Sequence, residues 1–283
     1  MATAAPAIDT SVVSRRTAAA IEAAEARAWA DLYAAAPAGW AETAGLASRW
    51  VGGTLVLSWA ATGRRYFSRA VGLGLVEPAT EAAVDEILAG WERAGIARFL
   101  LQSLPHCRPE GFEEMLAARG LEAFDAQDRL VRDGRSLGVV DPRPELTVER
   151  VTAETAEEWR DFMEATYRLD TGPWLPRLIG RPGWRQYVAR RNGRVVAARG
   201  MHVARVGWAW LGMDGPVPGV TTEDYEPDAA LCAVAVADGL ALGARTFIAD
   251  IEAPSPGLDT PAYGHFARLG FRRPYVRTHF ARM

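Results

Sequence analysis

The order of secondary-structure signals between residues 207 and 271 constrains the fold of this chain more than any other feature. The short apolar segment 207–213 begins and nearly ends in glycine and predicts a buried strand. After the turn-rich insert 214–227, residues 228–243 predict a helix, with an Asp at the start and a Gly at the end. A second buried strand, a short helix and a last strand are expected at 246–251, 261–269 and 275–280.

The first half of the chain repeats this order of elements. Its expected elements are a strand at 54–59, a helix at 81–94 with Thr80 as its N-cap, a strand at 98–103, a helix at 109–119 and a strand at 124–131. The two halves match weakly in sequence but consistently in order, which indicates an internal duplication.

This duplication predicts an α/β (α+β) protein of two tandem units, each a mixed, largely antiparallel sheet with flanking helices. We expect a disordered or frayed N-terminus at 1–19 and an N-terminal unit at 20–133. A linker rich in Gly and Pro follows at 134–144, and the C-terminal unit spans 145–283.

Composition excludes several classes of protein. With 49% hydrophobic and 24% charged residues and a net charge of −3, the chain fits a soluble globular protein. Every basic residue is an arginine, so a lysine Schiff base or a Walker lysine is excluded. Two cysteines and four scattered histidines predict no metal site. No signal peptide or membrane span is expected, which favours the cytoplasm and no membrane partner.

The order of elements in the second half, with Leu269-Gly270-Phe271 before the last strand, resembles the GNAT (GCN5-related N-acetyltransferase) superfamily. The segments 71–80 and 180–184 resemble tandem GNAT proteins of actinobacteria. This resemblance implies that two parallel strands splay apart to admit the pantetheine arm of acetyl-CoA or another acyl-CoA. It also implies that the N-terminal unit is non-catalytic and that the C-terminal unit holds the active site.

The resemblance places the donor beside two groups of residues. Leu211, Gly212 and Met213 lie on the first splayed strand, and Thr260 and Phe266 lie at the last short helix. The family's Arg/Gln-x-x-Gly-x-Gly/Ala pyrophosphate loop has no counterpart in the C-terminal half. The corresponding loop instead carries three acids, Glu223, Asp224 and Glu226. In the first half, Gly72-Leu73-Gly74 favours a tight turn over a phosphate loop.

Acyl transfer to an amine needs a base for the amine and an acid for the leaving thiol. The candidate bases are Asp214, just past the first splayed strand, and Asp250 and Glu252, at the end of the second. A partly buried carboxylate there would have a raised pKa. The candidate acids are Tyr263 and His265 on the last short helix. The alternative interpretation is that the acids cap turns and that Tyr263 and His265 pack in the fold.

Candidate acceptor-binding residues are aromatic or basic. Trp174, Trp184, Trp208 and Trp210 would suit a flat or apolar substrate, although core packing is favoured for the last two. Arg199 could bind a carboxylate or phosphate with two hydrogen bonds, and His202 lies on the same strand.

The sequence thus predicts an N-acyltransferase that moves an acyl group from a thioester donor to the amine of a small molecule. An acyl carrier protein could replace CoA as the donor. Alternatively, the chain is a GNAT-fold enzyme without CoA, such as one forming amide bonds from aminoacyl-tRNA, or a non-catalytic small-molecule binder. The net charge of −3 argues against tRNA. A monomer and a homodimer are both open.

Overall fold

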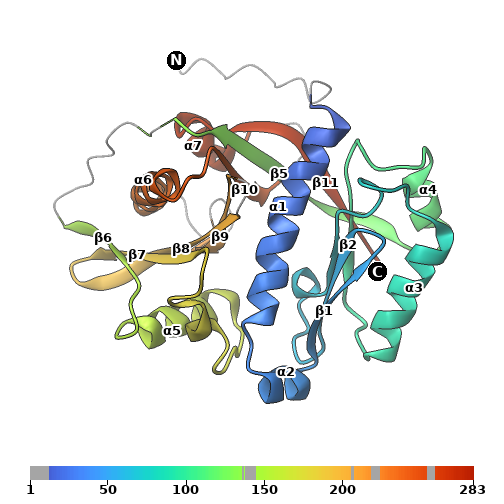
Figure 1. The fold of residues 1–283 in the computed structure, drawn as a ribbon, viewed down its shortest axis with the longest axis horizontal. Helices are drawn as coiled ribbons and strands as arrows, with labels where there is room; N and C mark the ends of the chain where they lie inside the picture. The colour runs from blue at the N-terminus through green and yellow to red at the C-terminus, as the bar shows by residue number, and fades with distance from the viewer. Residues whose placement is uncertain (1–12, 136, 138–144, 205–206, 218–223, 254–258) are drawn as a thin grey trace. The chain divides into compact units, whose positions relative to one another are not determined.

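The computed structural model describes residues 13–135, 137, 145–204, 207–217, 224–253 and 259–283, which form two compact units (Figure 1). The described part of the N-terminal unit comprises 13–128, 253 and 274–283, and that of the C-terminal unit comprises the other described residues from 129 to 273. Strand β5 (Glu122–Asp133) passes from one unit into the other. Residues 274–283, expected in the later unit, lie in the N-terminal unit because strand β11 (Arg272–Ala281) pairs antiparallel with β4.

The N-terminal unit combines helices with a sheet in the order β1-β2-β3-β4-β11. Its remaining elements are α1 (Arg15–Ala34), α2 (Ala38–Ala44), β1 (Leu46–Val51), β2 (Thr54–Trp59), a 3₁₀ turn (Arg65–Phe67), β3 (Arg69–Val71), α3 (Glu81–Arg93), β4 (Leu100–Ser103) and α4 (Phe112–Ala117). Only β3 and β4 pair in parallel here, through Arg69 with Leu100 and Ala70 with Leu101.

Local sequence explains where the helices of this unit begin. The Ser14 hydroxyl accepts a hydrogen bond from the Thr17 amide at 3.2 Å, and Thr80 accepts one from the Ala83 amide at 3.1 Å. Such a cap satisfies one of the amides that a helix start leaves without a partner. The prediction of Thr80 as an N-cap is confirmed. Helix α3 buries Trp91, whose ring stacks on Phe99 at 4.6 Å.

The C-terminal unit has a sheet in the order β10-β9-β8-β7-β6. Its elements are β6 (Leu146–Arg150), α5 (Ala156–Tyr167), a 3₁₀ turn (Leu175–Leu178), β7 (Trp184–Arg191), β8 (Arg194–Ala204), β9 (Trp208–Gly215), α6 (Glu226–Ala241), β10 (Thr246–Glu252) and α7 (Pro261–Arg268). Strands β9 and β10 are parallel, and the other pairs are antiparallel. Helix α6 covers one face of β7–β9 and α5 the other (Figure 1).

Two features of this unit were visible in the sequence. Asn192 and Gly193 have φ values of +52° and +78° between β7 and β8, as a type I′ hairpin turn requires, and Asn-Gly is the typical sequence of such a turn. The apolar positions of α6 pack on the sheet, where Leu231, Ala235 and Val236 are fully buried. Among the residues that the structure describes, no helix is long and apolar enough to cross a bilayer.

Candidate active site

Strands β9 and β10 of the C-terminal unit pair briefly and then part. The parallel register joins Trp208 with Thr246, Ala209 with Phe247 and Trp210 with Ile248. Strand β9 continues to Gly215 and β10 to Glu252, all of them described residues, and the register records no pair between those later parts. The ladder thus ends after Trp210 and Ile248, which agrees with the splay that the resemblance implied.

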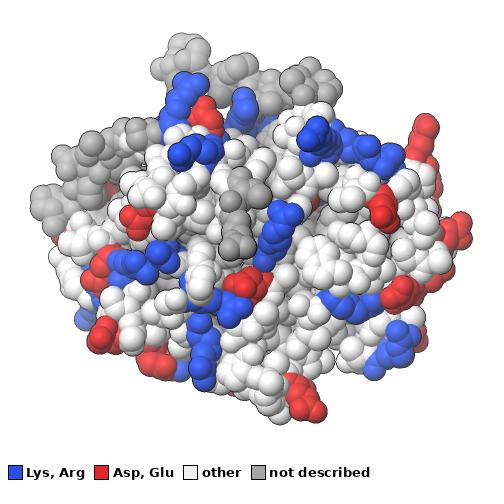
Figure 2. All heavy atoms as spheres, viewed as in Figure 1, with Lys and Arg blue, Asp and Glu red and all other residues white. Residues whose placement is uncertain are grey.

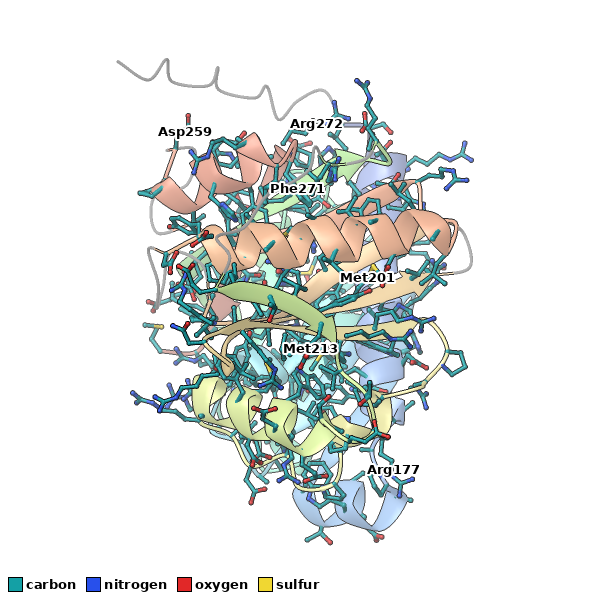
Figure 3. The ribbon with its side chains drawn as sticks, turned by 90° about the vertical axis from the view of Figure 1, so that its left-hand side faces the viewer. Arg177, Met201, Met213, Asp259, Phe271 and Arg272 are labelled. Carbon is teal, nitrogen blue, oxygen red and sulfur yellow. The ribbon has the colours of Figure 1, made fainter. Side chains whose placement is uncertain are left out.

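A β-bulge lies on β9 where the strands part. Gly200 of β8 faces Gly212 and Ala198 faces Gly215, so Met213 and Asp214 together oppose one residue. Met213 has a φ of +55°. A Cβ on Gly200 would lie 3.3 Å from the Met213 Cβ, which places Met213 on the α5 side of the sheet (Figure 3).

The bulge shifts the alternation of side chains along β9. Leu211 belongs to the core on the α6 side, and strict alternation would place Asp214 on the opposite side. Asp214 instead points toward Arg199, on the α6 side, at an Oδ1–Nη2 distance of 3.2 Å. The Tyr167 hydroxyl of α5 donates a hydrogen bond to the Asp214 carbonyl at 2.6 Å and fixes this part of the strand.

Asp214 belongs to a buried group that we call the acid–base cluster: Asp214, Arg199, Asp228 and His265. Arg199 is fully buried, and its Nη2 lies 2.5 Å from Asp228 Oδ1. The other oxygen of Asp228 lies 2.6 Å from His265 Nε2. Each residue comes from a different element, β9, β8, α6 and α7. The Asp228 carboxylate thus bridges a guanidinium and an imidazole.

The environment gives the two carboxyl groups of this cluster different pKa values. Burial raises the pKa of Asp214 to about 7, because the lowering by Arg199 is opposed by the charges of Asp228 and Asp250. Burial also acts on Asp228, but Arg199 and His265 together lower its pKa to about 2. Burial lowers the pKa of Arg199, but the charges of both aspartates outweigh it and raise that pKa above its usual range.

The cluster thus contains a carboxyl group with a raised pKa and a hydrogen-bonded imidazole in the unit that holds β9 and β10. Asp228 and Arg199 stay ionised, while Asp214 changes protonation near neutral pH. The Tyr225 ring stacks on His265 with centroids 4.8 Å apart. The bond to Asp228 and this stacking fix the orientation of the imidazole. Asp214 and His265 were expected from the sequence, and the structure joins them through Arg199 and Asp228.

The other candidate bases lie on β10. Phe247, Ala249 and Ile251 belong to the core on the α6 side, so Asp250 and Glu252 are on the alternate side of this strand. The charge of Asp250 contributes to the raised pKa of Asp214. Glu252 is exposed.

Tyr263, the other candidate acid, is buried. The Arg273 guanidinium lies 4.3 Å above its ring centre, and Asp259 binds Arg273 at 3.1 Å. Tyr263 therefore packs against Arg273 in the core of the unit, and its role in catalysis stays a prediction.

The candidate acceptor-binding tryptophans lie mostly in the core. Trp174, Trp184 and Trp210 are each at most 2% exposed, and Trp208 is partly buried. Trp184 contacts the His202 ring at 4.9 Å and the Trp210 ring at 6.2 Å. A Cβ on Gly212 would come within 2.1 Å of the Trp210 indole, so this ring lies directly over Gly212. These contacts favour the packing interpretation, and a role in acceptor binding remains untested.

Arg199 has a different partner from the one expected. Instead of facing a ligand, its guanidinium holds two carboxylates of the protein. The predicted acceptor contact is thus replaced by an internal ion pair, because the full burial of Arg199 requires an anionic partner.

The candidate donor-binding residues divide into two kinds. Leu211 and Phe266 are fully buried in the core of the unit, and Thr260 caps α7 by accepting a hydrogen bond from the Tyr263 amide at 3.1 Å. Gly212 and Met213 lie where β9 leaves β10. Within the described ranges, no group of three or more His, Cys, Asp or Glu side chains could hold a metal ion.

Sequence reasoning missed Asp228 and Tyr225. Asp228 was interpreted as a helix-start residue, and it does lie in the first turn of α6. Only the packing of α6 against β8 and α7 shows that its carboxylate binds Arg199 and His265. The signal that could have indicated this role of Asp228 is an acid in the first turn of a buried helix together with an arginine at an inward-facing position of a neighbouring strand.

Comparison with solved structures identifies the fold. A GCN5-related N-acetyltransferase from Kribbella flavida is similar with a TM-score of 0.56 and 19% identity, over 88% of this chain and 94% of that one. A tandem GNAT protein from the clavulanic acid biosynthesis pathway is similar with a TM-score of 0.54 and 13% identity, over 82% and 80% of the two chains. A scan with protein-family models and a search of curated proteins give no match.

The chain therefore has the GNAT fold in a tandem arrangement, as the sequence predicted. These identities are low, so the likeness defines the fold, and the chemistry has to be argued from the residues of the acid–base cluster.

Proposed function

We propose that the chain is an N-acyltransferase that moves an acyl group from a thioester to the amine of a small molecule, in its C-terminal unit. The observation that supports this most is the Asp214 carboxyl group. The bulge turns it inward where β9 and β10 part, and its pKa of about 7 suits a base at neutral pH. The GNAT fold is consistent with this reaction.

In the proposed reaction, Asp214 takes a proton from the acceptor ammonium group. The free amine nitrogen attacks the thioester carbon, a C–N bond forms and the C–S bond breaks. An N–H of β9 near the bulge stabilises the negative charge on the carbonyl oxygen. As the C–S bond breaks, the attacking nitrogen loses its second proton to become an amide, and His265 passes that proton to the leaving thiolate. Asp214 later returns its own proton to water, and the contact of His265 with Asp228 holds the ring for the transfer.

Exchange of Asp214 tests the proposal. Asp214→Asn keeps the shape of the side chain but removes the base, and kcat/KM should fall by about 10²- to 10⁴-fold. The rate of the unchanged protein should rise with pH through about 7, as Asp214 loses its proton, and the variant should lose this rise. Product formation by mass spectrometry, with a panel of acyl thioesters and amines, provides the measurement.

Glu252→Gln is the matched control, because Glu252 is the exposed candidate base at the end of β10. It should retain most of the activity. If Glu252→Gln abolishes transfer and Asp214→Asn does not, the base is misassigned. If no thioester supports transfer, aminoacyl-tRNA-dependent amide formation and a non-catalytic binder are the alternatives to test.

The surface of the chain gives the tRNA alternative little support. On the face that Figure 2 shows, described arginines are scattered and many lie beside acidic residues. Pairing of this kind reduces the excess of positive charge that phosphate backbones attract. We therefore place the thioester reaction first.

A further inference from the structure

The start of helix α6 differs from an anion-binding helix terminus. Helix α6 begins at Glu226, after Tyr225 as its N-cap. In the GNAT resemblance, this terminus would receive the pyrophosphate of an acyl-CoA. A helix start attracts an anion because its first amides lack partners and the helix dipole is positive there.

In this chain, the carboxylates of the protein already occupy that position. Glu226 and Asp228 lie in the first turn of α6, and Asp224 precedes them. Asp228 is nearly fully buried and is ionised down to a pH of about 2. Its negative charge is therefore a fixed part of this helix start.

The arginines around the helix start are engaged by these carboxylates. Arg191 binds Asp224 at 2.9 Å and Glu226 at 3.2 Å. Arg199 binds Asp228 at 2.5 Å and also contacts Asp214. Three carboxylates, at 224, 226 and 228, thus face these two arginines, and Asp228 also contacts His265. The count covers described residues, and residues 218–223 lie outside them.

A pyrophosphate does not fit this set of charges. It would bring further negative charge to a helix start whose dipole is already compensated, and it would have to compete with carboxylates for both arginines. The opening between β9 and β10 carries no such conflict, because the thioester arm of the donor is uncharged. The charged pyrophosphate of an acyl-CoA is thus disfavoured at the start of α6, whereas its uncharged thioester arm is not disfavoured between β9 and β10.

We propose that the C-terminal unit recognises its donor through an uncharged thioester arm and that the nucleotide half of an acyl-CoA contributes nothing to binding. This inference rests on the proposed acyl transfer and defines its donor class: acyl-pantetheine or a similar thioester without pyrophosphate at α6.

The test compares acetyl-CoA with acetyl-pantetheine on the full chain. We expect kcat/KM for acetyl-pantetheine to equal that for acetyl-CoA within about threefold, or to exceed it. An advantage of acetyl-CoA of 100-fold or more would overturn the inference, because the nucleotide half would then supply binding.

A matched pair of variants sharpens the result. The double variant Asp224→Asn, Glu226→Gln frees Arg191 and should improve kcat/KM for acetyl-CoA about tenfold, with acetyl-pantetheine changed less than twofold. The control is Glu157→Gln, Asp161→Asn on α5, where Arg160 is likewise held by two acids. It should change neither donor. An unchanged or weaker use of acetyl-CoA by the first double variant contradicts the inference.

Calorimetric binding separates this inference from the proposed function. If neither donor is turned over but pantetheine binds as well as CoA, acyl transfer fails and the donor inference stands. If CoA binds at least 100-fold more tightly than pantetheine, the donor inference fails whatever the activity. Binding of neither compound overturns both.

Discussion

In each unit, a pair of parallel strands flanks a helix along the chain, β3-α3-β4 in the N-terminal unit and β9-α6-β10 in the C-terminal unit, and the described segments that follow the strands differ. After β3 in the N-terminal unit, the chain is tied to the segment that follows β4. The Arg108 amide donates to the Gly74 carbonyl at 3.0 Å, and the Ala79 amide donates to the Arg108 carbonyl at 2.8 Å. The Cys107 thiol donates to the Leu73 carbonyl at 3.2 Å. These bonds join the segment after β3 to the segment after β4.

Gly72-Leu73-Gly74 forms a turn in the segment that follows β3. Gly72 and Gly74 have φ values of +83° and +78°, and a Cβ on Gly74 would lie 2.7 Å from the Arg108 carbonyl oxygen. These glycines permit a tight turn against neighbouring backbone. The tight-turn interpretation is confirmed, and it agrees with a non-catalytic N-terminal unit, which stays a prediction.

Both units also contain a buried ionic cluster, and the ratio of acids to arginines differs. In the N-terminal unit, Glu25 binds Arg69 at 2.9 Å and Arg277 at 2.6 Å, and Glu22 binds Arg277 at 3.3 Å. Two carboxylates thus face two arginines, whereas in the acid–base cluster Asp214 and Asp228 share Arg199. In the acid–base cluster, burial and the neighbouring charges of Asp228 and Asp250 outweigh Arg199 and raise the pKa of Asp214 to about 7.

Glu25→Gln should produce the largest effect on stability. It removes a fully buried carboxylate from both Arg69 and Arg277 and should cost about 3–5 kcal/mol in the free energy of unfolding, measured by urea denaturation. The exposed exchange Glu42→Gln should cost less than about 0.5 kcal/mol. The folded fraction of Glu25→Gln should keep its kcat/KM. A tenfold loss of kcat/KM in folded protein would show that the N-terminal cluster takes part in catalysis.

The pH dependence of stability is the next prediction. The pKa of Asp214 is raised from its usual 3.8 to about 7, so the folded state holds this proton more tightly than the unfolded state does. Stability from this group is present below pH 4 and is lost as pH rises through 7, by up to about 4 kcal/mol. Asp214→Asn should therefore match the unchanged protein at pH 4 and exceed its stability at pH 8.

Thermal unfolding at several pH values measures this difference. Asp228 acts in the opposite direction, since its pKa is lowered and its contribution is lost as pH falls from about 4 to about 2. If the stability of Asp214→Asn and that of the unchanged protein depend on pH in the same way, the pKa of Asp214 is not raised and the two clusters do not differ in this respect.

Replacement of either of two glycines by alanine should have the smallest effects on stability, and the activities of the two variants should show which unit is catalytic. Gly74→Ala and Gly212→Ala should each lower the free energy of unfolding by about 1–3 kcal/mol, because their Cβ atoms would meet the Arg108 carbonyl and the Trp210 indole. Only Gly212→Ala should also lower kcat/KM, since Gly212 lies where β9 leaves β10. Loss of activity in Gly74→Ala, measured on folded protein, would contradict the comparison.

The sequence predicted the order of elements, because local signals define it. Thr80 at a helix start and Asn192-Gly193 in a hairpin act within a few residues. The bounds of β3 depend on packing instead. Residues 65–67 form a 3₁₀ turn and only 69–71 a strand, since the rings of Tyr66 and Phe67 pack against Trp29 at 5.8 and 6.0 Å.

The candidate site was predictable only in part. Asp214 and His265 could be selected because the resemblance placed them near the splayed strands. At the bulge the positive φ belongs to Met213 and not to the neighbouring Gly212 or Gly215, and alternation along the strand could not show which side of the sheet Asp214 faces. The contacts of Asp228 depend on three elements far apart in sequence, and local patterns do not encode such contacts.

The position of β11 has a consequence for how the protein is made on the ribosome. Arg277 is a partner of Glu22 and Glu25, which lie more than 250 positions earlier in α1. During synthesis these two glutamates therefore lack a cation that is translated more than 250 residues later. The N-terminal unit should complete its folding only after the C-terminal unit has been synthesised, although most of it emerges first.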